Sequence, residues 1–215
     1  MVASDPDHSE AVGHLRGADP VLAAIIDQVG PCMLGSSTDR GGPAHDHYGA
    51  LLRAIVGQQL SVSAARSIYR RLTDRYGGRT PSSAQLLEDG PEALREAAGL
   101  SRAKVAFLRD LAERLETGTL RLDDIENVPD DEVARRLIEV KGVGQWTVDM
   151  YLIFHLGRPD VLPVGDLGIR RAAMLAYRLR KLPQPARLVK LARPWRPWRS
   201  VASWYLWASL RALPA

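Results

Sequence analysis

The chain has 215 residues, a net charge of +4 and a hydrophobic fraction of 46%, with 29 Lys and Arg against 25 Asp and Glu. These values are ordinary for a globular protein, and no apolar run approaches the roughly 20 residues that a membrane-spanning helix needs. The single cysteine, Cys32, excludes an internal disulfide framework and an iron–sulfur cluster held by several cysteines. Residues 1–14 lack the layout of a signal peptide, so we expect a soluble, cytoplasmic protein.

The charge is distributed unevenly along the chain. After Asp166 there are nine Arg and two Lys but no Asp or Glu, whereas the preceding residues carry 18 basic and 25 acidic side chains. The chain favours Arg over Lys, 25 to 4, and a bias in composition is the alternative explanation. Because such a bias does not account for the missing acids, the basic C-terminal part indicates a polyanionic partner, with nucleic acid favoured.

Helix signals dominate the sequence. Residues 1–17 and 35–46 are rich in Gly, Ser, Asp and His, and we expect a flexible N-terminus and a loop there. Asp19 and Pro20 supply an N-cap and a first-turn proline for a helix that ends before Gly30. Further helices are predicted over residues 46–56, from Ser61 to Tyr76, after Pro81, after Pro91, from Ser101 to Leu115, over 130–140, up to about Leu156, from Asp166, after Pro185 and over 198–210. No strand pattern or repeat is present, so the predicted fold class is all-α.

A glycine-containing turn, Leu137-Ile138-Glu139-Val140-Lys141-Gly142-Val143-Gly144, lies between two predicted helices. Two glycines separated by one apolar residue permit a tight turn with positive φ and leave no side chain beneath the backbone. The N–H groups of Val143 and Gly144 then open the next helix, where they can bind a phosphate without reading base sequence. An ordinary corner between helices is the alternative, but the flanking residues resemble a helix-hairpin-helix DNA-binding motif. We therefore expect Lys141, Gly142, Val143 and Gly144 to contact DNA.

Asp166 stands at the end of a Pro- and Gly-containing loop and at the start of a predicted helix. An Asp in this position is usually an N-cap, and the residue by itself favours that structural role. Its place after the hairpin and before the basic tract resembles the helix-hairpin-helix glycosylases, in which this Asp is catalytic. Departure of a base from deoxyribose builds positive charge on the sugar, which an ionised carboxylate stabilises while it orients or deprotonates water.

All five tryptophans lie in the last 70 residues. An electron-rich indole attracts a cationic alkylated purine, whereas tryptophans that fill a small core are the alternative. We expect Trp146 and Trp207 to be walls of a base pocket, and Trp198 and Trp204 to belong to the core.

Together these motifs resemble the DNA-3-methyladenine glycosylase II group, the alkylation-repair branch of the helix-hairpin-helix DNA glycosylase superfamily. The resemblance covers about residues 19–210 and includes the segment Ile55-Val56-Gly57-Gln58-Gln59-Leu60-Ser61. It implies a base-excision repair hydrolase that flips alkylated bases such as 3-methyladenine out of duplex DNA and hydrolyses the N-glycosidic bond. The implied fold is compact and two-lobed, without an N-terminal β domain. A glycosylase domain over residues 18–215 would hold the DNA and base cleft between its lobes, with the hairpin at about 137–156.

Further roles follow only from this resemblance. Gln59 and Leu60 match the loop that intercalates where the base has left the stack, with a helix-capping loop as the alternative. A monovalent cation would bridge the hairpin to a phosphate through the carbonyls of Ile138, Val140 and Val143. No catalytic metal and no cofactor are expected.

The sequence also departs from some relatives. Glycosylase/lyases place their Schiff-base lysine just after the hairpin, where this chain has Trp146, so we expect a monofunctional enzyme that uses water. Met150 stands where some relatives have a second pocket aromatic, which leaves the lesion range open. Two alternatives remain: a non-catalytic lesion-sensing DNA-binding protein of the same fold, and a bifunctional glycosylase/AP lyase. The expected partner is double-stranded DNA with damaged bases and no membrane, and the expected state is a cytoplasmic monomer, nucleoid-associated if the source is bacterial.

Overall fold

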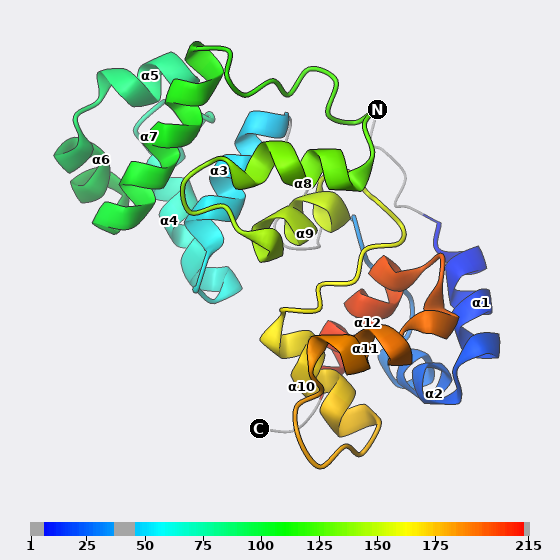
Figure 1. The fold of residues 1–215 in the computed structure, drawn as a ribbon. Helices are drawn as coiled ribbons and strands as arrows, with labels where there is room; N and C mark the ends of the chain where they lie inside the picture. Colours follow the sequence, from blue (N-terminus) through cyan, green and yellow to red (C-terminus); the bar gives the residue numbers. More distant parts are fainter. Residues whose placement is uncertain (1–6, 37–45, 213–215) are drawn as a thin grey trace. The chain divides into compact units, whose positions relative to one another are not determined.

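The computed structural model describes residues 7–36 and 46–212, and all of the regular structure in these two ranges is helical (Figure 1). This confirms the predicted all-α class. No helix in the described ranges has the length and apolar character needed to cross a membrane. Residues 1–6 of the expected flexible terminus and residues 37–45 of the expected loop lie outside the described residues.

The chain divides into two compact units, each of which is described by itself. Unit 1 consists of Met1–Gly42 and Leu152–Ala215, and unit 2 of Pro43–Tyr151. Unit 1 contains α1 (Ser9–Ala18), α2 (Pro20–Val29), α10 (Leu167–Ala176), α11 (Pro185–Leu191), the 3-10 helix η2 (Arg193–Trp195) and α12 (Arg199–Ala212). Unit 2 contains α3 (His47–Gly57), α4 (Val62–Asp74), α5 (Ser83–Glu88), α6 (Pro91–Ala98), α7 (Arg102–Glu116), α8 (Asp130–Ile138) and most of α9 (Gln145–Phe154).

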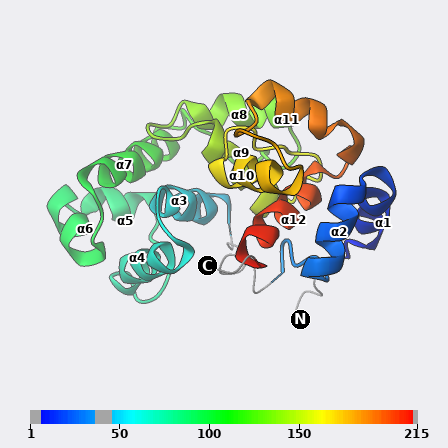
Figure 2. The same cartoon turned by 90° about the horizontal axis from the view of Figure 1, so that it is seen from below.

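The expectation of a flexible N-terminus over residues 1–17 is wrong for its second half, because α1 occupies Ser9–Ala18. Ala11 and Leu15, four residues apart on one face of this helix, are 2% and 0% exposed. The helix packs on α2, beside it in Figure 2, and on α12. Composition suggested disorder because Gly, Ser, Asp and His dominate the segment, and two buried apolar residues are too few to give a strong periodic signal.

Asp19 caps α2 as predicted and also joins three elements of unit 1. Its carboxylate accepts hydrogen bonds from the backbone N–H groups of Val21 (2.9 Å) and Leu22 (3.3 Å). The same carboxylate accepts from the Tyr177 hydroxyl and from Nε1 of Trp195 at 2.8 Å. Because Asp19 is only 6% exposed, these four donors offset the cost of burying its charge. Burial and the neighbouring carboxylate raise the pKa of Tyr177, so its phenol remains a donor.

We expect Asp19→Ala to lower the free energy of unfolding by about 3 kcal/mol or more, since it removes a helix cap and leaves buried donors unsatisfied. Asp27→Ala is the control, because Asp27 pairs with Arg16 at the surface and its side chain is 66% exposed. That change should cost less than about 1 kcal/mol. Urea unfolding followed by far-UV circular dichroism measures both, and equal losses would contradict the central role of Asp19.

Candidate active site

The hairpin between α8 and α9 depends on a glycine that lies directly on an aromatic ring. Gly142 has φ of +77°, and a Cβ added there would lie 2.2 Å from Cδ2 of Phe107 on α7. The N–H of Val143 donates to the carbonyl of Val140 at 3.0 Å, which closes the turn. Both the backbone conformation and the packing therefore require glycine at this position.

Asp110 on α7 holds the hairpin from the other side. Its Oδ2 accepts from the backbone N–H of Lys141 and from Nε of Arg114, both at 2.9 Å, and its Oδ1 lies 3.3 Å from Nζ of Lys141. Burial raises the pKa of Asp110, but the hydrogen bonds from Lys141 and Arg114 outweigh it, so the net shift is downward. The ionised carboxylate thus stabilises the turn, while the Lys141 side chain remains 71% exposed.

Gly144 lies at the start of α9, where the sequence predicts backbone N–H groups that can bind a phosphate. Its carbonyl accepts from the N–H groups of Thr147 (2.9 Å) and Val148 (3.2 Å), which are the first hydrogen bonds of the helix. Gly144 and Gln145 are exposed at this helix start, where the backbone N–H groups have no acceptor within the helix. The arrangement supports a backbone anion site at the hairpin.

The segment that follows α3 carries the predicted intercalating residues. Gln58 leaves helical geometry with ψ of 133°, and Gln59 has φ of +57°, a left-handed conformation that non-glycine residues seldom adopt. Gln59 is exposed, and the apolar Leu60 is 38% exposed. Local strain and an exposed apolar side chain support the intercalating role, which stays a prediction.

Two residues hold this segment in place: Lys104, which the sequence did not single out, and Gln58, which the sequence placed in the segment without a role of its own. Nζ of Lys104 donates to the carbonyls of Val56 (2.7 Å) and Gln58 (2.9 Å), and burial lowers the pKa of this ammonium. The side-chain amide of Gln58 donates to the carbonyl of Gly142 at 2.8 Å and to Oγ1 of Thr147 at 3.1 Å. The intercalating segment and the hairpin are therefore joined by hydrogen bonds within unit 2.

Asp166 is the N-cap of α10 in unit 1. Its Oδ1 accepts from the backbone N–H of Ile169 at 2.8 Å and from Nε1 of Trp207 on α12 at 2.9 Å. Asp166 is partly exposed. The cap proposed as the alternative role is thus present, but the indole bond goes beyond what a cap requires.

The structure joins Trp207 to Asp166 within unit 1, and it places the other two predicted pocket residues on α9 of unit 2. Trp146 is half-buried, and Met150, four residues along the same face of α9, is 7% exposed. The base-binding role of these side chains stays a prediction.

The remaining tryptophans divide differently from expectation. Trp204 is 5% exposed, which confirms it as core, whereas Trp198 is only half-buried. Trp195, which received no structural role from the sequence, is completely buried and bonded to Asp19. Trp195 and Asp19 are 176 positions apart in the sequence, so no local pattern indicates this contact.

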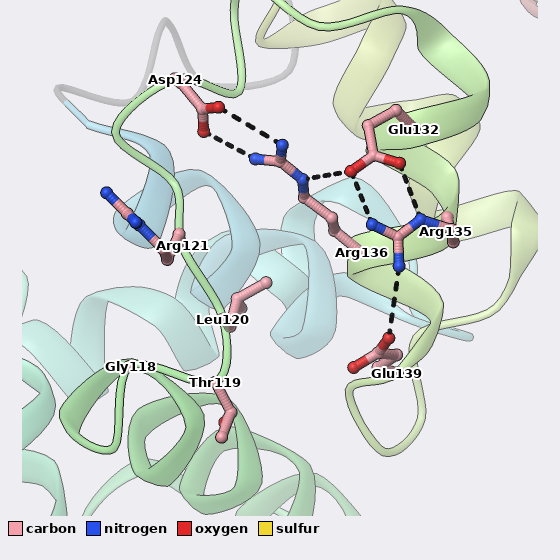
Figure 3. A pocket seen from close by; sticks show the side chains of 9 residues that line it. All are labelled: Gly118, Thr119, Leu120, Arg121, Asp124, Glu132, Arg135, Arg136 and Glu139. Carbon is pink, nitrogen blue, oxygen red and sulfur yellow. Dashed lines mark hydrogen bonds and ion pairs between the residues drawn. The ribbon is translucent and has the colours of Figure 1, made fainter.

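A pocket of about 370 Å³ on unit 2 does not suit a planar base (Figure 3). Its walls include two ion-pair chains that meet at Glu132: Arg136 bridges Glu132 and Asp124, and Arg135 bridges Glu132 and Glu139. None of the residues that line it is aromatic. Since the charged residues that line it, apart from Arg121, are already in ion pairs, this pocket is assigned no role in binding DNA.

Among the described residues, no group of three or more His, Cys, Asp or Glu side chains could hold a metal ion. The hairpin carbonyls offer a different donor set. Ile138 ends α8, so its carbonyl has no acceptor role within that helix, and the Val140 carbonyl keeps a second lone pair after bonding Val143. Three neutral oxygens at Ile138, Val140 and Val143 fit a monovalent cation, which stays a prediction.

We expect Gly142→Ala to reduce both stability and DNA binding, because the new Cβ meets Phe107. Gly118→Ala is the matched control, since Gly118 also has positive φ (+69°) but an added Cβ has nothing within 4 Å. Strain in φ should cost each variant roughly 1 kcal/mol, and the clash should cost Gly142→Ala roughly 1–3 kcal/mol more. Urea unfolding and titration with undamaged duplex measure the two effects. Equal losses, or wild-type affinity in Gly142→Ala, would contradict the hairpin assignment.

Comparison with known proteins places these features in one family. Residues 52–197 match the model of the HhH-GPD superfamily of base excision DNA repair proteins, and the chain belongs to this superfamily. That range contains the intercalating segment, the hairpin and Asp166.

Within the superfamily the chain is similar to particular alkylation-repair proteins. It is 34% identical over 196 residues to DNA-3-methyladenine glycosylase 1 of Schizosaccharomyces pombe, covering 90% of this chain and 84% of that protein. It is 32% identical over 209 residues to the alkylbase DNA glycosidase-like protein mag2 of the same organism, covering 96% and 95%. The solved structure of an S. pombe 3-methyladenine DNA glycosylase in complex with abasic DNA matches with a TM-score of 0.85 and 32% identity, covering 96% of this chain and all of that one.

Proposed function

We propose that this chain is a DNA-3-methyladenine glycosylase of base-excision repair, a hydrolase that removes alkylated bases from duplex DNA. The observation that carries the proposal is Asp166, a carboxylate held at the start of α10 by two hydrogen bonds. It follows a hairpin whose backbone suits a phosphate, in a chain that resembles named 3-methyladenine glycosylases over nearly its whole length.

The chemistry assigns Asp166 an electrostatic role. As the bond between C1′ and the base nitrogen breaks, the base takes the electron pair and positive charge develops on the sugar. A base alkylated at N3 or N7 is cationic before this step and leaves as a neutral molecule, so no acid has to protonate it. The Asp166 carboxylate stabilises the sugar cation, and water adds its oxygen to C1′ while its proton passes to the carboxylate and on to solvent.

The DNA-binding parts of unit 2 act before this chemistry. The hairpin at Gly142 and Gly144 holds a backbone phosphate, and the segment with Gln59 and Leu60 fills the gap that a flipped base leaves in the stack. Because the side chain of Gln58 bonds the hairpin, the two contacts with DNA are made by one hydrogen-bonded assembly.

The proposal is for a monofunctional enzyme. Trp146 occupies the position of the lyase lysine, and Lys141 is paired with Asp110. Lys104 has the lowered pKa expected of a nucleophilic amine, but its ammonium donates to two backbone carbonyls. Hydrolysis with an abasic site as the product is therefore favoured over a Schiff-base reaction.

We expect Asp166→Asn to slow excision by roughly a hundredfold or more, because the amide keeps the cap and the indole bond but removes the charge. Affinity for undamaged duplex should stay or increase, since a negative charge near phosphates is lost. Asp46→Asn, which alters the N-cap of α3 in the same way, is the control and should excise normally. Single-turnover release of methylated purines measures the rates, and excision by Asp166→Asn within tenfold of wild type would exclude the assignment.

We also expect sodium borohydride, added during turnover, to trap no covalent complex between protein and DNA. Absence of a crosslink on a denaturing gel, together with alkali-labile abasic product, supports hydrolysis. An efficient crosslink would instead show an amine nucleophile. In that case Lys104→Met and Lys141→Met would identify which ammonium forms the Schiff base.

A further inference from the structure

We propose that Trp207 is a positioning residue for Asp166, and that Gly168 provides the space in which the two side chains meet. This inference rests on the proposed function, since it concerns the carboxylate assigned to catalysis. Its basis is a hydrogen bond of 2.9 Å from Nε1 of Trp207 to Oδ1 of Asp166. The indole comes from α12 and the carboxylate from the start of α10, two helices of unit 1 that pack together (Figure 2).

Two donors from different directions reach the same carboxylate oxygen. The N–H of Ile169 approaches Oδ1 along the first turn of α10, and the indole N–H approaches it from α12. The terminal torsion of an Asp side chain is broad, so a single cap leaves the carboxyl plane poorly defined. A second donor at Oδ1 fixes that plane and with it the direction of the other oxygen. Holding a charged group in its reactive orientation before substrate arrives lowers the barrier, because no reorganisation is needed.

Gly168 is the residue that permits this contact. A Cβ built on Gly168 would lie 3.0 Å from Oδ1 of Asp166, 3.2 Å from Cδ1 of Trp207 and 3.3 Å from Nε1 of Trp207. Its φ is not in the left-handed region, so the backbone conformation does not call for glycine. Because glycine is a poor helix former, its presence near the start of α10 is explained by the close approach of the indole and the carboxylate.

Packing also holds the Trp207 ring that donates this hydrogen bond. The centroids of the Trp207 and Phe154 rings are 5.7 Å apart, and the ring planes are inclined by 33° to each other. This contact holds the indole while its N–H reaches Asp166. The sequence assigned Trp207 only a stacking role toward the base, which would depend on the ring and not on the N–H. The two roles therefore predict different results for Trp207→Phe, which keeps an aromatic ring and removes the donor.

The first test measures excision by wild type, Trp207→Phe, Gly168→Ala and the double variant. Duplex DNA methylated with dimethyl sulfate is the substrate, under single-turnover conditions, and affinity for undamaged duplex is measured in parallel. We expect Trp207→Phe and Gly168→Ala each to slow excision roughly 10- to 100-fold, the range for losing a hydrogen bond to a charged group. Affinity should change less than about twofold, and the double variant should be no slower than the slower single variant, because both act on one contact.

Trp204→Phe is the matched control. Trp204 lies on the same helix, and its buried Nε1 has no hydrogen-bond partner among the described residues. This variant also replaces an indole by a phenyl ring, yet it should excise within about twofold of wild type. Urea unfolding should show that Gly168→Ala remains fully folded under the assay conditions, which separates positioning from a loss of folding.

A second readout needs no substrate. The indole N–H resonance of Trp207 in a ¹H–¹⁵N spectrum is identified by its absence in Trp207→Phe. It should move in Asp166→Asn and in Gly168→Ala, while Trp204→Phe leaves it in place. Excision by Trp207→Phe within twofold of wild type, additive losses in the double variant or an unmoved resonance would overturn the inference. Wild-type protein that releases no methylated base would contradict the proposed function instead, and the resonance would still decide whether the indole holds the carboxylate.

Discussion

The way in which α3 ends determines the arrangement of two loops of unit 2, the segment from Gln58 to Leu60 and the hairpin. The chain leaves the helix at Gln58, so the carbonyl of Val56 loses the partner that another turn would supply. Lys104 satisfies that carbonyl and the carbonyl of Gln58, and the Gln58 amide continues the network to Gly142. A requirement of backbone hydrogen bonding at one helix end thus fixes both a strained exposed segment and the hairpin. Without these bonds, the segment after α3 would lose its hydrogen-bonded link to the hairpin.

Asp166 in unit 1 combines a structural role with the proposed catalytic role. A carboxylate in a fixed place can both cap a helix and stabilise a sugar cation, so the two roles are compatible. From the sequence the two roles were alternatives, because most Asp residues at a helix start are N-caps. The hydrogen bond from Trp207 distinguishes Asp166 from an ordinary capping Asp, which needs only backbone donors.

Local signals succeeded where the structure is local. Asp19 caps its helix as predicted, and Ser61 and Ser101, where helices were predicted to begin, accept hydrogen bonds from those helices. The hairpin glycine has the predicted positive φ. Failures occurred where distant residues decide the outcome. Helix α1 was missed because its stability comes from packing on α2 and α12, and the burial of Trp195 was missed because its partner is Asp19.

By itself the sequence determined the helical class, the positions of most helix ends, the hairpin and the catalytic candidate. These follow from short-range chemistry: capping side chains, glycine conformations and motif spacing act over a few residues. Only the tertiary structure decided that Gln58 ties the intercalating segment to the hairpin, that Phe107 requires glycine at Gly142, and that Trp207 reaches Asp166. Each of these contacts joins segments far apart in the chain, and hydrogen bonds of 3 Å between such segments depend on packing that no local pattern encodes.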